Sequence, residues 1–69
     1  MTLEEKDNVI FTACSNVIPD INYYLVEKYT DVNLDDYTVS TFQTQIQNDI
    51  TTLQTDSSII KAWRDSKNT

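Results

Sequence analysis

Apolar residues in the N-terminal part of the chain recur every three or four positions, the spacing of one face of an α-helix. Thr2 and Glu5 have the spacing of a capping box, in which a hydroxyl and a carboxylate bind each other's backbone amides. We therefore predict a helix over about residues 3–17 whose apolar side is broad enough to contact more than one neighbour. That side consists of Leu3, Ile10, Cys14 and Val17, widened by Phe11 and Ile18.

Pro19 interrupts this pattern without shifting its phase. A proline lacks an amide donor and clashes with the preceding helical turn, so a break or sharp kink is expected before it. Proline is well tolerated in the first turn of a helix, which predicts a second helix over about residues 19–30. Its apolar side continues the first one, through Ile21, Tyr24, Leu25 and Tyr29.

The third segment fits two patterns. Phe42, Ile46 and Ile50 alternate with polar residues as in a half-buried strand, and the many threonines favour a strand. The helical spacing, however, holds from Val39 to Leu53, and a strand of about 15 residues would be far longer than usual. We therefore predict a helix over about residues 38–54, with Asp36 or Thr38 as its N-cap.

A fourth helix is predicted over about residues 57–66, because Ile59, Ile60 and Trp63 follow the capping residues Asp56 and Ser57. Residues 67–69 are expected to fray. The sequence thus predicts an all-α fold, a small antiparallel bundle of three to four short helices forming a single domain over residues 1–69. The predicted core consists of Leu3, Ile10, Cys14, Val17, Ile21, Leu25, Phe42, Ile46, Ile50, Leu53, Ile60 and Trp63.

The segment DVNLDDYTVSTF, residues 31–42, begins like a calcium loop. Asp31, Asn33 and Asp35 match the first three ligand positions of an EF-hand. The position that needs glycine is Asp36, and Phe42 stands where a bidentate glutamate would close the site. We therefore interpret the segment as a loop whose polar side chains cap backbone amides, and we predict no metal site.

The composition argues against most kinds of chemistry. The chain contains one cysteine, no histidine and no glycine. Zinc sites need several Cys or His ligands, the usual activated nucleophiles need a histidine, and phosphate-binding loops need glycine. We therefore expect a protein that is not an enzyme and has no cofactor, and we interpret Cys14 as a small buried apolar residue.

The charge is unevenly distributed. Eleven acidic and five basic residues give a net charge of −6, and no cation lies between Lys28 and Lys61. Such a field disfavours direct binding to nucleic acid or to anionic membranes, and no apolar run is long enough to cross a bilayer. The acidic middle segment is either a surface for a basic partner or a solvated face chosen for solubility.

Two functions fit these patterns, and the first is a small acidic protein-binding module, an adaptor or inhibitor that docks on a larger protein with a basic surface. Three tyrosines lie close together in the second predicted helix, and tyrosine is enriched at interfaces. The candidate binding residues are Tyr23, Val26, Asp31, Asp35, Asp36, Tyr37 and Asp49.

The alternative is a structural subunit of a homo-oligomer or of a phage-type particle, since a short chain gains stability by association. The acidic middle of one copy would then contact the basic end of another, where Lys61, Arg64 and Lys67 lie. The frequent Asn, Asp, Ile, Thr and Tyr residues resemble the usage of proteins from AT-rich genomes, including bacteriophages. Under either function we expect a cytoplasmic protein, in the host cytoplasm if it is encoded by a phage.

Overall fold

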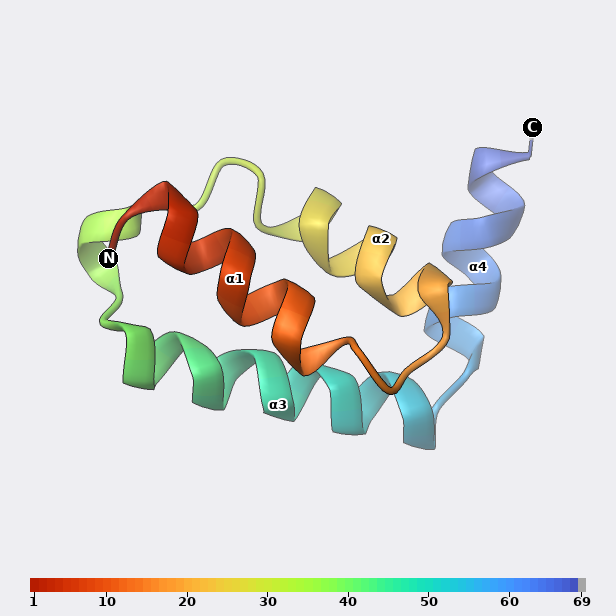
Figure 1. Cartoon of the computed structure of the whole chain (residues 1–69). Helices are drawn as coiled ribbons and strands as arrows, with labels where there is room; N and C mark the ends of the chain where they lie inside the picture. Colours follow the sequence, from red (N-terminus) through yellow and green to blue (C-terminus); the bar gives the residue numbers. More distant parts are fainter. Residues whose placement is uncertain (69) are drawn as a thin grey trace.

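The computed structural model describes residues 1–68 and confirms the all-α prediction. The elements are α1 (Leu3–Ala13), α2 (Pro19–Lys28), the short 3₁₀ helix η1 (Leu34–Asp36), α3 (Val39–Thr55) and α4 (Ser58–Lys67). α2 runs back alongside α1, α3 runs back again past both, and α4 stands at a steep angle at the far end of the bundle (Figure 1). No helix among residues 1–68 is both long and apolar enough to span a bilayer.

The predicted break before Pro19 is longer than expected. α1 ends at Ala13, whereas the prediction was a helix to residue 17, and a turn over residues 14–17 leads to α2. Pro19 is the first residue of α2. An amide hydrogen at this position would have no acceptor within the helix, so its absence costs no hydrogen bond. α2 in turn ends at Lys28, two residues before the predicted end.

α3 is the long helix that the 3-and-4 spacing predicts, so the strand interpretation of this segment is wrong. Thr38 is its N-cap, and the side chains of Thr38 and Thr41 each accept a hydrogen bond from the other's backbone amide, at 3.2 and 2.9 Å. A threonine therefore takes the place that glutamate usually holds in a capping box. Length and capping together outweigh the β-propensity of the threonines.

The core lies where α1, α2 and α3 meet, and one residue from α4 completes it. Phe42 is completely buried, and the rings of Tyr29 and Tyr37 meet it edge-on at centroid distances of 5.2 and 5.4 Å. Such aromatic contacts add to the free energy gained by burying apolar surface. The buried apolar residues are Val9, Ile10, Cys14, Ile21, Leu25, Tyr29, Phe42, Ile46, Ile50, Leu53 and Ile60.

Several residues of the first apolar stripe were assigned wrongly to the buried side. Leu3, Phe11 and Ile18 are exposed, whereas Lys6 and Val9 are buried. The reason is that the side of α1 that faces α2 and α3 carries Lys6, Val9 and Ile10. Phe11, two positions after Val9, therefore points away from these helices. Two other predicted core residues, Val17 and Trp63, are only half-buried.

α4 is joined to the bundle by apolar contacts and by ion pairs. Ile60 belongs to the core, and the Trp63 ring meets the Tyr24 ring edge-on at a centroid distance of 6.0 Å. The Arg64 guanidinium binds the Asp20 carboxylate, with Nε at 2.8 Å, and the Lys67 ammonium lies 2.6 Å from a Glu27 carboxylate oxygen. Both acids belong to α2. The helix continues one residue beyond its predicted end, to Lys67, and Asn68 is its C-cap; Thr69 lies outside the described residues.

Candidate protein-binding surface

Large apolar side chains remain exposed on α1 and α2. Phe11 on α1 has 73% of its surface exposed, and Tyr23 and Val26 on α2 have 63% and 51%. Tyr23 and Val26 are three residues apart and therefore lie on one side of α2. Single exposed apolar residues are common, but an exposed phenylalanine next to other exposed apolar groups forms a patch that water solvates poorly.

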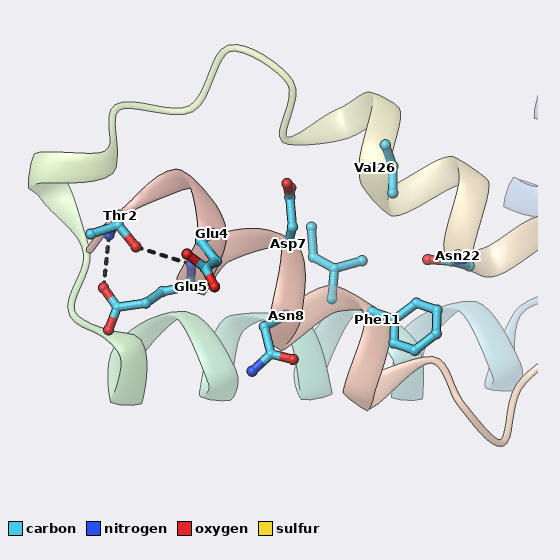
Figure 2. A pocket seen from close by; sticks show the side chains of 9 residues that line it. Thr2, Glu4, Glu5, Asp7, Asn8, Phe11, Asn22 and Val26 are labelled. Carbon is cyan, nitrogen blue, oxygen red and sulfur yellow. Dashed lines mark hydrogen bonds between the residues drawn. The ribbon is translucent and has the colours of Figure 1, made fainter.

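A groove between α1 and α2 brings part of this patch together. Its volume is about 700 Å³, and the buried Ile10 side chain lines it along with the exposed Phe11 and Val26. Figure 2 shows Asn22 and Val26 coming from α2 and the other side chains from α1 and its N-cap. The α1–α2 groove, as we name it, is lined by Thr2, Glu4, Glu5, Asp7, Asn8, Ile10, Phe11, Asn22 and Val26.

The charges of this groove are all negative. Among residues 1–68, neither Glu4 nor Asp7 takes part in an ion pair. Glu5 is engaged locally, because its carboxylate accepts the Thr2 amide at 2.8 Å while the Thr2 hydroxyl accepts the Glu5 amide at 3.1 Å. These hydrogen bonds lower the pKa of Glu5 and keep it charged. An apolar floor thus lies beside three carboxylates.

A buried lysine holds the two walls together. Lys6 lies on α1 within the charged run EEKD, yet only 6% of it is exposed. Its ammonium donates a hydrogen bond of 3.0 Å to the carbonyl of Tyr29, which caps the C-terminal end of α2. A cation is favoured there because the carbonyls at a helix C-terminus carry partial negative charge. Nothing in the sequence distinguished Lys6 from a solvated lysine.

Most of the other cations are also engaged within the chain. Lys28 lies 3.4 Å from the Asp49 carboxylate, and Arg64 and Lys67 bind the α2 acids described above. Lys61 alone among the cations in residues 1–68 forms neither an ion pair nor a hydrogen bond through its side chain. The basic end of the chain is therefore largely neutralised by its own α2.

The structure divides the predicted binding residues between three places. Tyr23 and Val26 lie on the exposed side of α2, and Val26 lines the α1–α2 groove. Asp31, Asp35 and Asp36 are exposed in the connection between α2 and α3, outside the groove lining. In that connection the Asn33 side chain accepts the Asp35 amide at 3.1 Å, the local capping that the loop interpretation predicts. The remaining two residues, Tyr37 and Asp49, make internal contacts.

Tyr37 and Asp49 contribute to the fold. Tyr37 is half-buried against Phe42, as described above. The Asp49 carboxylate accepts a hydrogen bond from the Tyr29 hydroxyl and a longer one, 3.4 Å, from the Gln45 amide. Burial of Tyr29, and then its bond to Asp49, raise the pKa of the phenol above its ordinary value of 10.0. Asp49 thereby connects α3 to the end of α2.

Sequence reasoning missed Phe11 as a surface residue, although one signal was present. Glu4, Asp7 and Phe11 follow one another at intervals of three and four, so they form one row along α1. A row that begins with two carboxylates favours the solvent side of a helix, because unpaired charges are costly to remove from water. The prediction of the buried side used only the spacing of apolar residues and did not consider the charged residues in the same row.

Comparison of the chain with protein-family models, with curated proteins and with solved structures gave no match. The surface chemistry of the α1–α2 groove is therefore the basis for a functional proposal.

Proposed function

We propose that this protein is a small, non-enzymatic protein-binding module that docks on a larger protein through the outer side of α1 and α2. The observation that carries this proposal is the exposure of Phe11 beside Val26 at the α1–α2 groove. A phenylalanine that contributes little to its own core gains free energy when a partner covers it. Aromatic anchors of this kind are enriched at interfaces and account for much of their binding energy.

Two features support an interface over a catalytic pocket. The groove lacks histidine and cysteine, and its acids either cap a helix or face solvent. Tyr23 lies on the same side of α2 as Val26 and extends the apolar surface beyond the groove. An extended, shallow apolar surface with charged groups at its border is the usual anatomy of a docking site.

The first experiment places a photo-crosslinking phenylalanine derivative at position 11, or at position 43 as a control, in a protein carrying its tag at the C-terminus. Gln43 is exposed on α3, away from the α1–α2 groove. We expect one discrete cross-linked partner from position 11 and none from position 43. The same partners from both positions, or none from either in cells that express the protein naturally, would overturn the proposal.

The identified partner is then purified and its affinity measured by calorimetry. We expect Phe11→Ala to weaken binding at least about tenfold, the loss typical of an interface anchor, while Gln43→Ala has no effect. Circular dichroism establishes that both variants are folded. Unchanged affinity of the Phe11 variant would remove this side of the molecule from the interface.

The alternative function, a subunit of a homo-oligomer, uses the same exposed surface, because a second copy would also cover Phe11. Light scattering over micromolar concentrations distinguishes the two. The proposal predicts a mass near that of one chain, 8.0 kDa. A stable multiple of that mass that Phe11→Ala converts to monomer would replace the docking module with an assembly subunit.

A further inference from the structure

We propose that the occupant of the α1–α2 groove is an amphipathic helix of another protein, with an apolar anchor flanked by lysine or arginine. This inference rests on the proposed function and specifies its partner. Three observations carry it: the shape of the groove, the sign of its charges, and the engagement of the chain's own cations.

The shape argument comes from the arrangement of the helices. The groove lies between two helices that run side by side, and α3 contributes no residue to its lining (Figure 2). α3 itself packs against both α1 and α2, with Phe42 and Ile46 fully buried. A partner helix in the groove would pack against the same pair of helices in a position that α3 leaves open. A strand is a poorer occupant, because residues 1–68 contain no sheet edge with which it could pair.

The charge argument determines which helix would fit. Glu4 and Asp7 lack a cationic partner, and Phe11 lies in the same row of α1. A helix whose apolar residues contact Phe11 and Val26 brings its flanking positions next to these carboxylates. Cations at those positions attract them, whereas acids there would be repelled. The groove therefore selects a basic amphipathic helix over an acidic one.

The same charges argue against a second copy as the occupant. Two copies related by a twofold axis would place the acids of both grooves close together, in a pair of chains that each carry −6. A head-to-tail contact would have Lys61 as its one unpaired cation among residues 1–68, because Arg64 and Lys67 already bind Asp20 and Glu27. An external basic helix supplies positive charge for Glu4 and Asp7, whereas most cations of this chain are bound to its own acids.

The test is a titration of isotope-labelled protein with two synthetic helical peptides, followed by heteronuclear NMR. Both peptides carry leucines on one helical side; in the first the flanking residues are lysines and in the second they are glutamates. We expect the lysine peptide to shift the amide signals of Asp7, Phe11 and Val26 and to bind at least about tenfold more tightly than its glutamate twin. Equal binding of the two peptides would overturn the inference.

Two double variants with the same change in net charge separate a local effect from a general one. Glu4→Gln with Asp7→Asn removes charge beside the groove, and Asp31→Asn with Asp35→Asn removes it from the connection between α2 and α3. We expect the first to weaken the lysine peptide about fivefold and the second to leave its affinity unchanged. Equal weakening by both, or signal shifts centred on residues 31–36, would show attraction to net charge and overturn the inference.

The outcome also distinguishes this inference from the proposed function. If neither peptide binds while Phe11→Ala still weakens binding of the cross-linked partner, the docking module stands and the helical occupant is wrong. If Phe11→Ala leaves partner binding intact, the docking surface itself is wrong. Dimerisation of the protein that Phe11→Ala reverses would make a second copy the occupant.

Discussion

α1 separates two grooves of nearly equal size, about 700 Å³ beside α2 and about 720 Å³ beside α3. The α1–α2 groove combines exposed apolar side chains with unpaired acids. The groove beside α3 is lined mainly by amides and hydroxyls, among them Thr12, Gln43 and Gln47. Water can hydrogen-bond to that second surface, so a partner that covers it gains little. The comparison teaches that the two grooves differ in the composition of their walls and not in volume, and this difference is why we propose docking at the α1–α2 groove.

The largest expected effect comes from truncating Phe42, a fully buried aromatic side chain of the core. Phe42→Ala should lower the free energy of unfolding by about 3–5 kcal/mol, because it leaves a cavity among Tyr29, Tyr37 and Ile46. This would be a large fraction of the stability of so short a chain. Urea unfolding followed by circular dichroism measures the loss; a change below about 1 kcal/mol would contradict the buried position of Phe42.

A second pair of substitutions tests the two sides of α1 directly. Val9, which is 7% exposed, lines the groove beside α3, and Phe11 belongs to the α1–α2 groove. Val9→Ala should cost about 1–3 kcal/mol, whereas Phe11→Ala, which removes more atoms, should cost less than about 0.5 kcal/mol. The two variants are compared by urea unfolding under one set of conditions. The reverse order would mean that Phe11 is part of the core.

Tyr29→Phe should destabilise the protein by about 1–2 kcal/mol, because the variant loses the hydrogen bond to the Asp49 carboxylate. The folded-state pKa of Tyr29 is raised, so this contribution is fully present below the unfolded-state pKa near 10.0 and declines as the pH rises above it. Unfolding measured from pH 8 to pH 11 should therefore show a difference between wild type and variant that shrinks above about pH 10. A constant difference over this range would contradict a stabilising hydrogen bond from the neutral Tyr29 hydroxyl to Asp49.

Thr38→Ala should cost about 1 kcal/mol, because the Thr41 amide loses its capping acceptor at the start of α3. The helix that carries Gln43 and Gln47 would be weakened at its end, while the α1–α2 groove is untouched. Thermal melting measures the loss of stability, and Thr38→Ser, which retains the hydroxyl, serves as the matched control. Equal melting temperatures of the alanine and serine variants would argue against the cap.

The helices could be predicted from the sequence because their signals are local. The Thr2 capping box, Pro19 and the spacing from Val39 to Leu53 each depend on residues within a few turns of one another. The orientation of α1 could not be predicted in this way. It depends on which neighbours meet it, and the bond from Lys6 to Tyr29 joins residues 23 positions apart. The exposure of Phe11 follows from that orientation, and the only local signal for it was the row that Phe11 shares with Glu4 and Asp7.

The attachment of α4 affects how the protein opens. Of the α4 residues that the structure describes, only Ile60 is buried, and the ion pairs to Asp20 and Glu27 are partly exposed. Exposed ion pairs contribute little and weaken further as salt screens them. α4 should therefore detach as a cooperative unit while α1, α2 and α3 remain folded, and its amide hydrogens should exchange with solvent through this partial opening. The C-terminal helix thus provides a second level of stability within the same short chain, one that ionic strength adjusts and whose loss removes only Ile60 from the core.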